Sequence, residues 1–465
     1  MRPVLLLLLT GALLTSCGKP QPPTILEAIK QSGELVVATR YSAASYYDGA
    51  QGMSGLESDL ARLFAERLGV DLRVMVVKSV SDILPSIVNG EAHLAAAGLT
   101  VTKNRRRRVR FGPAYQTITP QLIYRIGTDA PRNLGEINGH LEVVKGSSHA
   151  ERLRQLKEVY PHLSWSENDS LDSEQLLALV WEQVIDYTIT NSNEAALVRR
   201  YYPELRVAFG IDDPKPLAWA LPRSEDTSLY NEVEKFFQDI RADGTLAQLI
   251  DRHYGHAQDF DYVETRRYLA HIESRLPAYQ SMFRKAADET GMDWRLLAAI
   301  GYQESHWNPE AKSPTGVRGI MMLTRDTMRQ LGLEERLTPE NSIIGGARYL
   351  NLMKGKIPKR IPEPDRTWLA LAAYNIGFGH LEDARILTQQ QGDDPDKWVD
   401  VQKHLPLLSE KKWYDKTRHG YARGREPVRY VENVRSYYDI LAWYTESQTP
   451  PSATMPRIPD ILPAL

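Results

Sequence analysis

Cysteine is almost absent from this sequence, since Cys17 is the only one among 465 residues. A single cysteine excludes an internal disulfide and a cysteine-rich metal site. The 11 histidines never take the HExxH spacing of a helical zinc site, so neither a metal nor another cofactor is expected. The chain also lacks a large excess of positive or negative charge, because 57 basic and 59 acidic side chains leave a net charge of −2. This balance gives no electrostatic reason to expect a nucleic acid as a partner.

No apolar run is long enough to cross a bilayer as a helix, which takes about 20 residues. The longest run, Val4–Leu14, follows a basic Arg2 and leads into the residues Leu-Thr-Ser-Cys. This order is typical of a secretory signal peptide. It also resembles a bacterial lipoprotein signal, which implies a signal peptide over residues 1–16 and lipidation of Cys17. An ordinary signal peptide with a chance cysteine is the alternative.

The residues after Cys17 carry two further expectations. Gly18 stands where an Asp would retain a lipoprotein at the inner membrane, so the resemblance implies the periplasmic face of the outer membrane. A lipoprotein cysteine carries more than one acyl chain, which stable anchoring requires. Residues 17–33 would form the lipidated cysteine and linker, in which the Pro-rich stretch 18–24 is a stiff polar spacer.

The length of the chain suits two or three domains. Between residues 34 and 256, segments with strand character alternate with segments with helix character, which predicts an α/β domain. A long helix over 231–255, broken at Asp243-Gly244, would close this domain. Before it, we expect strands at 34–40 and 71–78, a helix at 57–70, and a helix, turn and strand over 81–102.

Four stretches of this domain resemble the periplasmic amino-acid-binding proteins of the third solute-binding class. They read VVATR, GMSGLESDLARLFAERLG, NGEAHLAAAGLTVTKNRRRRVRFGPAY and RADGTLAQLIDRHYG. The resemblance implies two α/β lobes with a small ligand, an amino acid or a muropeptide, in the cleft between them. Lobe one would comprise about 34–118 and 219–256, and lobe two about 119–218.

The resemblance places the carboxylate of this ligand on Arg105, which follows LTVTKN. A planar guanidinium forms bidentate, charge-assisted hydrogen bonds with a carboxylate. Thr100, at the end of the preceding strand, would assist through its hydroxyl and its backbone N–H. The next residues, Arg106–Arg108, are expected on a solvated face, which is the usual place for a run of charges.

The remaining ligand residues implied by the resemblance are polar or aromatic. Ser147 and Ser148 precede a helix whose N-terminus can accept an anion. Tyr46 or Tyr47 matches the aromatic region that packs on the side chain of the ligand. The family usually binds the α-amine of the ligand with an Asp, but Asn191 occupies that position here. Because an Asn adds no charge, we expect weak binding of free amino acids, or binding of a peptide fragment.

In the second half of the chain, a carboxylate lies where an apolar residue belongs in the helix predicted for DWRLLAAIGYQES. Asp293 is a suitable N-cap, and Leu297, Ile300 and Gly301 form the i, i+3, i+4 stripe of a half-buried helix. Glu304 takes the next position of the stripe, in the last turn, where the helix dipole disfavours negative charge. Burial and dipole both raise the pKa of a carboxyl group, and a general acid must hold its proton near neutral pH. A solvated Glu at a frayed helix end is the alternative.

Four motifs in chain order resemble the lytic transglycosylase family: ES at 304–305, GVRGIMMLT at 316–324, AAYNIGFGH at 372–380 and GREPVRYV at 424–431. The resemblance covers residues 268–446 and implies a mainly α-helical domain like that of goose-type lysozyme. Residues 257–267 would be a linker between the two domains. The Pro-rich residues 447–465 are expected to be a disordered tail.

This family cleaves the β-1,4 bond between N-acetylmuramic acid and N-acetylglucosamine in peptidoglycan glycan strands. By resemblance, Glu304 would protonate the glycosidic oxygen and then, once ionised, deprotonate the C6 hydroxyl of the muramic residue. That hydroxyl would attack C1 in an intramolecular step that gains from proximity and leaves a 1,6-anhydro ring. A hydrolase would need a second carboxylate, and the sequence shows no obvious candidate.

The first two motifs also imply contacts with the substrate. Ser305 would orient the substrate or the carboxylate of the preceding residue. Gly316 and Gly319 would let the backbone approach the sugars closely. Met321 and Met322 would line the cleft, and Met322 stands where the family often has a Gln for a polar sugar contact.

The last two motifs imply four further substrate-binding residues. Tyr374 would supply a stacking ring, and Asn375 an amide for the N-acetyl group. Tyr430 would hydrogen-bond near Glu304, and Glu426 would be a structural partner in the same motif. The sequence thus predicts a lipid-anchored periplasmic enzyme whose first domain, on closing around a ligand, could shift the active site between states. There are two alternatives: a sensor lipoprotein that binds glycan without cleaving it, and a lysozyme-like hydrolase.

Overall fold

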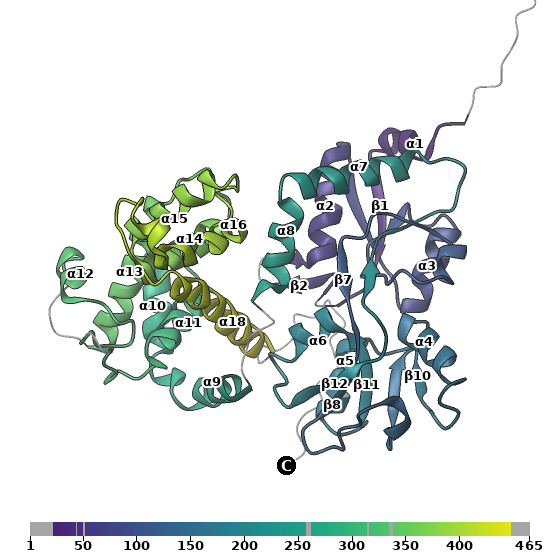
Figure 1. Cartoon of the computed structure of the whole chain (residues 1–465), viewed down its shortest axis with the longest axis horizontal. Helices are drawn as coiled ribbons and strands as arrows, with labels where there is room; N and C mark the ends of the chain where they lie inside the picture. Colours follow the sequence, from purple (N-terminus) through teal and green to yellow (C-terminus); the bar gives the residue numbers. More distant parts are fainter. Residues whose placement is uncertain are drawn as a thin grey trace, which may run out of the picture.

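The protein folds into two domains, an α/β domain followed by a helical one, which lie side by side (Figure 1). This computed structural model confirms the fold class predicted from the sequence. The signal peptide, Cys17 and the predicted tail beyond residue 447 lie outside the described residues. None of the helices described is long and apolar enough to cross a membrane. The structure describes residues 22–42, 44–49, 52–256, 262–313, 316–333 and 338–447.

Lobe one of the first domain is built on a mixed sheet with the strand order β4-β1-β5-β14-β6. Alternate residues of β1 face opposite sides, so α1, α2, α7 and α8 pack on one face of the sheet and α3 on the other. The bounds are α1 Ile25–Ser32, β1 Glu34–Thr39, β2 Tyr47–Gly49, β3 Gly52–Ser54, α2 Leu56–Leu68, β4 Asp71–Val76, α3 Val80–Val88, β5 Leu94–Ala95, η1 Arg105–Arg107, β6 Arg110–Phe111, β14 Ala220–Leu221, α7 Ser228–Ala242, α8 Thr245–Ile250 and η3 Asp251–Gly255.

Side-chain caps and glycines set the ends of the helices in this lobe, and α1 lies within the predicted linker 17–33, so part of that linker is helical. The side chain of Thr24 caps α1 by accepting from Glu27 N–H, and Glu27 caps the N–H of Thr24 in return. Gly69 ends α2 in the left-handed conformation, φ 70°, which glycine adopts without steric cost. The break predicted at Asp243-Gly244 is confirmed, since Gly244 takes φ 77° between α7 and α8.

Lobe two has a second five-stranded sheet with the order β10-β9-β11-β8-β12, covered by α4 on one face and by α5 and α6 on the other. The antiparallel pair β7 and β13 lies where the chain passes between the lobes. The bounds are β7 Gln116–Ile118, β8 Pro120–Arg125, η2 Leu134–Glu136, β9 Leu141–Val144, α4 Ser148–Leu156, β10 Ser166–Asn168, α5 Ser173–Trp181, β11 Tyr187–Asn191, α6 Ser192–Val198, β12 Leu205–Gly210 and β13 Lys215–Leu217.

The second domain is a helical bundle in which α11 packs against α10, α13 and α18 around one apolar core. α9 begins at Tyr262, so the linker predicted over 257–267 is shorter than expected, because Thr265 and Tyr268 are buried on a helix there. The bounds are α9 Tyr262–Ser274, η4 Leu276–Ala278, α10 Gln280–Thr290, α11 Trp294–Ser305, α12 Arg325–Gln330, α13 Pro339–Lys356, α14 Asp365–Ile376, α15 Phe378–Gln390, α16 Trp398–His404, η5 Leu405–Ser409, α17 Lys411–Tyr414 and α18 Arg425–Ser447.

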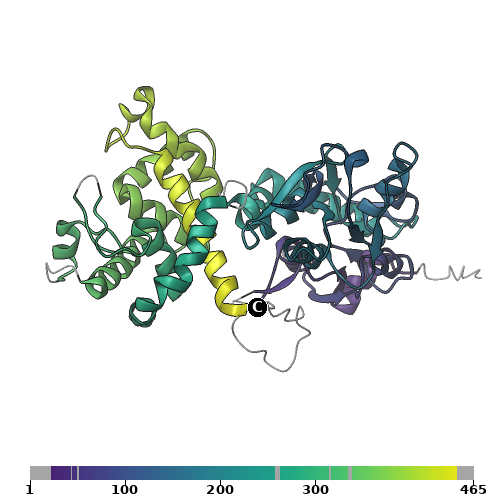
Figure 2. The ribbon, with the colours of Figure 1, turned by 90° about the horizontal axis from the view of Figure 1, so that it is seen from below.

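The long helix α18 belongs to the core of the second domain and also contacts the first (Figure 1). Figure 2 shows it crossing the helical domain in yellow toward the α/β domain. Asp439 accepts a hydrogen bond from Arg200 of lobe two at 2.7 Å, and lies 2.7 Å from the ring nitrogen Nε2 of His256. Four residues earlier, Arg435 donates to the carboxylate of Asp251, at the end of lobe one, at 3.0 Å. One helix therefore contacts both lobes.

Candidate active site

Glu304 lies in the last turn of α11, as predicted. Asp293 caps this helix by accepting from the N–H of Arg295 at 2.8 Å. The helix ends abruptly after Ser305, because His306 and Trp307 both take left-handed backbone conformations, φ 53° and 55°. The indole of Trp307 is buried and donates to the carbonyl of Ala298 at 2.8 Å, which holds this turn against the helix.

The side chain of Glu304 is half-buried, and its carboxyl group has one hydrogen-bonded neighbour among the described side chains. Tyr430 Oη donates to Glu304 Oε1 at 2.7 Å. Burial raises the pKa of Glu304 from 4.5 to about 7, although the hydrogen bond from Tyr430 acts to lower it. The predicted rise in pKa is thus confirmed, and the alternative of a frayed, solvated Glu is wrong.

The loop that carries the second motif is tied to the end of α11 by Ser305. The hydroxyl of Ser305 lies 2.9 Å from the carbonyl of Ile320 and 3.1 Å from that of Gly301. Both contacts are to backbone oxygens, so Ser305 positions the loop beside Glu304. In the same loop Gly316 takes φ 87°, a conformation that a side chain would strain.

Met321 does not line a cleft, which corrects the prediction made for it. Its side chain is fully buried, and a Cβ on Gly346 would lie only 2.4 Å from Met321 Cε. The absence of a side chain at Gly346 therefore makes room for the methionine in the core. Met322 is partly exposed and takes φ 46°, an unusual conformation for a residue with a long side chain. Local strain of this kind is typical of functional sites.

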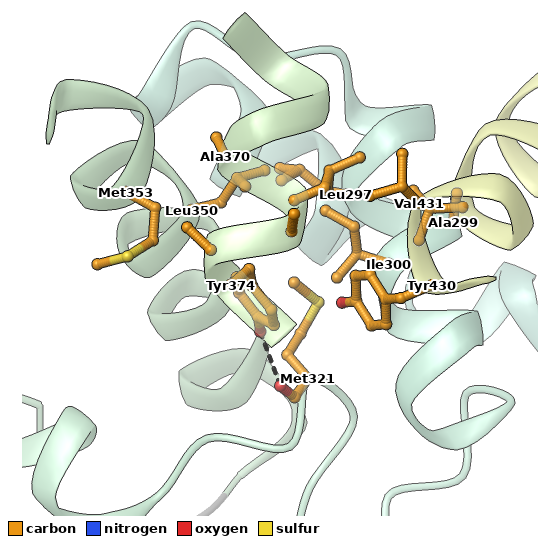
Figure 3. Packing of buried hydrophobic residues seen from close by; sticks show 14 of the residues in the cluster. Leu297, Ala299, Ile300, Met321, Leu350, Met353, Ala370, Tyr374, Tyr430 and Val431 are labelled. Carbon is orange, nitrogen blue, oxygen red and sulfur yellow. Dashed lines mark hydrogen bonds between the residues drawn. The ribbon is translucent and has the colours of Figure 1, made fainter. Parts of the chain in front are cut away.

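Tyr374 supports the site from within, which differs from its predicted role as a sugar-stacking ring. It is 8% exposed, and its hydroxyl donates to the backbone carbonyl of Met321 at 2.8 Å (Figure 3). Its ring lies nearly parallel to that of Tyr430, at a centroid distance of 6.3 Å. Asn375, the next residue, is exposed and free to meet a ligand. Glu426 is exposed and pairs with Arg423 at 3.2 Å.

Two residues of α13 that no motif indicated complete the support of the site. Ser342 accepts from the N–H of Met321 at 3.0 Å and is fully buried. Tyr349 packs edge-on against Tyr374, with ring centroids 5.2 Å apart. A buried Ser and a half-buried Tyr are ordinary positions on a helix that packs against a core, so the sequence carried no signal for either role.

In the first domain, the predicted ligand residue Arg105 is turned inward while Arg106, Arg107 and Arg108 are exposed, as expected. Burial lowers the pKa of Arg105 to about 10. Its guanidinium donates to the carbonyl of Thr100, in lobe one, at 3.1 Å and to that of Gly146, in lobe two, at 3.2 Å. Arg105 therefore joins the two lobes.

The other predicted ligand residues are only partly brought together. Asn191 Oδ1 accepts a hydrogen bond from ring nitrogen Nε2 of the buried His149 at 3.0 Å. Ser147 caps α4, and Ser148 is the first residue of that helix. Tyr46 packs on another surface tyrosine, with ring centroids 5.7 Å apart. Of these residues, only Asn191 lines the cavity between the lobes.

A buried ion pair that sequence reasoning missed spans the cleft. Arg40, at the end of β1, donates to Glu194, which lies on α6 three residues beyond Asn191. Burial disfavours the charged form of both side chains. Each charge stabilises the opposite charge beside it, however, so the pKa of Arg40 is raised and that of Glu194 is lowered. The cavity left between the lobes is about 10 Å³, room for about one water molecule. The two lobes are therefore closed against each other, and their own side chains fill the cleft.

Comparison with known proteins covers both domains. Residues 34–256 match the family described as bacterial extracellular solute-binding proteins, family 3, and residues 281–397 match the transglycosylase SLT domain. A solved structure of the P235GK mutant of ArgBP from T. maritima aligns with a TM-score of 0.45 at 20% identity, over 50% of this chain and 99% of that one.

Two relatives match almost the whole chain. The membrane-bound lytic murein transglycosylase F 1 of Alkalilimnicola ehrlichii is 53% identical over 429 residues, which is 92% of this chain and 87% of the relative. The membrane-bound lytic murein transglycosylase F of Saccharophagus degradans is 49% identical over 422 residues, 90% of this chain and 84% of the relative. With a family 3 solute-binding domain joined to a transglycosylase SLT domain, and with these relatives along almost its whole length, this chain belongs to the membrane-bound lytic murein transglycosylase F family.

Proposed function

We propose that Glu304 alone carries out both the acid and the base step when this lytic transglycosylase cleaves peptidoglycan strands. The observation that carries the proposal is its raised pKa of about 7, which arises from burial with Tyr430 as the one opposing influence. No other carboxylate among the described residues contributes to this pKa. A hydrolase that uses a second carboxylate would place one within about 10 Å of the first.

The first step transfers the proton of Glu304 to the glycosidic oxygen, which then leaves as the hydroxyl of the departing sugar. Tyr430 donates to Oε1, so the other oxygen of the carboxyl group is the one that gives up the proton. In the second step the carboxylate removes the proton of the C6 hydroxyl of the muramic residue. That oxygen bonds to C1, which closes the 1,6-anhydro ring and restores the acid.

Mass spectrometry of the products tests this proposal. Purified peptidoglycan is digested with the wild-type protein and with Glu304→Gln, which keeps the shape of the side chain and removes its proton chemistry. Anhydro-muropeptides from the wild type alone are the expected result. Products heavier by one water would identify a hydrolase, and equal activity of the variant would assign the chemistry to another residue. Binding of glycan without products would favour a sensor lipoprotein.

We propose that the cleft of the first domain takes a ligand with a carboxylate and an amine, such as an amino acid or the end of a muropeptide. The support is the pair Arg40 and Glu194, each of which could exchange its partner for the opposite charge on a ligand. Glu194 thus supplies the anion that Asn191 lacks. Calorimetric titration with free amino acids and with muropeptides tests this, and loss of binding in Glu194→Gln is expected.

We propose that ligand binding in this cleft regulates the cleavage of glycan strands through α18. Glu194 lies on α6, and Arg200, just beyond the end of α6, binds Asp439 of α18, the helix that also carries Tyr430. Opening of the lobes would move these contacts with α18, and a ligand shifts such an equilibrium only by its differential affinity for the two states. Initial rates on glycan, measured with and without saturating muropeptide, test this. Equal rates would contradict it.

We further propose that the chain is a lipoprotein of the outer membrane, anchored through Cys17. The names of the relatives carry the words membrane-bound, which agrees with a membrane association of this chain. The support for the anchor itself is the lipoprotein-like end of the signal sequence. Mass spectrometry of the protein extracted from outer-membrane fractions is expected to find acyl chains on Cys17. A mature chain with an unmodified N-terminus would contradict it.

A further inference from the structure

The run of arginines in the first domain has exposed members that neither the ligand cleft nor the active site uses. In the 3₁₀ turn η1, three residues make one turn, so the inward position of Arg105 leaves Arg106 and Arg107 facing outward. Arg108 follows and is exposed as well. Arg223, also exposed, donates to the carbonyls of Arg106 and Arg107 at 3.3 and 3.2 Å. We call these four residues, Arg106, Arg107, Arg108 and Arg223, the arginine patch.

The arginine patch holds unneutralised positive charge. Some exposed arginines elsewhere in the protein pair with glutamates, as Arg73 and Arg154 do at 2.8 and 2.6 Å. Within the part of the chain that the structure describes, the patch arginines form no such ion pair, and the contacts of Arg223 are to backbone oxygens. Cations held close together without anions attract an anionic surface.

The patch lies beside the point where the chain enters the domain. Behind it, Arg110 donates to the carbonyl of Ser224 at 3.1 Å. Two residues further on, the carboxylate of Asp226 accepts from the N–H of Ile25, the first residue of α1. These contacts place the start of α1 and the arginine patch on one side of lobe one.

Only seven residues, 18–24, separate Cys17 from α1. Even fully extended, they reach about 25 Å, at roughly 3.5 Å per residue. A membrane that holds lipidated Cys17 would therefore lie close to the patch. α1 is on the side of the first domain turned away from the helical domain (Figure 1). A protein seated on this side would project its active site away from the bilayer.

We infer that the arginine patch seats the protein on an anionic phospholipid surface. The inference builds on the anchor proposed at Cys17, but the attraction requires only the folded domain. Each basic residue near an anionic bilayer strengthens binding about fivefold at low salt. The patch alone gives weak, salt-sensitive binding, and together with an acyl anchor it fixes the orientation of the domain.

Sedimentation with vesicles tests the inference without the anchor, using the chain from residue 18 onward. The vesicles contain 30% phosphatidylglycerol in phosphatidylcholine, or phosphatidylcholine alone. We expect binding to the anionic vesicles only, and its loss in 0.5 M salt. The triple variant R106Q/R107Q/R108Q should bind at least tenfold more weakly, and R106K/R107K/R108K should bind like the wild type. Unchanged binding of the glutamine variant, or equal binding to neutral vesicles, would overturn the inference.

A matched control removes the same charge from other faces. R132Q/K359Q/K411Q replaces three exposed cations outside the patch and should bind anionic vesicles like the wild type. All variants should cleave glycan normally, which shows that they are folded. If the glutamine variant instead lost affinity for purified sacculi and not for vesicles, the patch would be a cell-wall contact. If the patch binds vesicles but Cys17 of the protein extracted from membranes carries no acyl chain, the anchor is refuted and this inference stands.

Discussion

Replacing Glu304 by Gln should stabilise the protein at alkaline pH while abolishing its activity. The folded state holds this carboxyl group with a pKa of about 7 instead of 4.5, because burial penalises the ionised form. Between these two values the folded state binds more protons than the unfolded state, so stability falls as the pH rises. Well below pH 4.5 the group is neutral in both states, and above about pH 7.5 nearly the full penalty is present.

The size of this effect follows from the difference in pKa. At 1.36 kcal/mol for each pH unit, a difference of about 2.5 destabilises the folded protein by about 3 kcal/mol above pH 7.5. A neutral Gln avoids this penalty. For a domain of this size, 1 kcal/mol shifts the melting temperature by about 2–4 °C. Glu304→Gln should therefore melt about 6–12 °C higher than the wild type at pH 8, and nearly together with it at pH 4.5.

The assay is differential scanning calorimetry of the full chain at both pH values. The unfolding transition that shifts in the variant reports on the helical domain, which contains Glu304. Glu310→Gln is the matched control, because Glu310 is exposed only six residues away. It should leave the melting temperature unchanged at both pH values. A Glu304→Gln variant that melts at or below the wild type at pH 8 would refute the idea that burial keeps this carboxyl group protonated.

Three further changes test the surroundings of the site. Tyr430→Phe removes the hydrogen bond that lowers the pKa of Glu304, so the alkaline limb of kcat/KM should move up by about 0.5–1 pH unit; an unmoved limb would exclude Tyr430 from tuning the acid. Ser305→Ala should lower kcat and destabilise the protein by about 1 kcal/mol in urea titrations, with Ser305→Thr close to the wild type. Burial opposes the charge of Asp439, yet His256 and Arg200 hold its pKa far below the usual range, so its contribution persists down to acid pH. Asp439→Asn should cost about 2 kcal/mol at pH 7 and abolish any effect of cleft ligands on the rate of cleavage.

The sequence predicts best what depends on local periodicity. The alternation of strands and helices indicated an α/β domain, whose two lobes followed from the resemblance, and the apolar stripe of α11 placed Glu304 in a half-buried last turn. Prediction from the sequence fails where residues far apart in the chain come into contact in the folded protein. Met321, in a loop, is buried because Gly346 on α13 leaves room for it. The pair Arg40 and Glu194 joins residues 154 positions apart, so no local pattern shows that the two charges meet.

The placement of Tyr430 on α18 links the chemistry of this chain to its architecture. A single helix holds the residue that hydrogen-bonds Glu304 and, two and a half turns later, the carboxylate of Asp439 that binds Arg200. Because a helix moves as a rigid body, a shift at one end displaces the phenol at the other. The hydrogen bond to Oε1 is the contact that lowers the pKa of Glu304, so lengthening it would raise that pKa and slow the base step first. Regulation from the ligand cleft should accordingly appear as a change in pH profile and not as a change in substrate affinity.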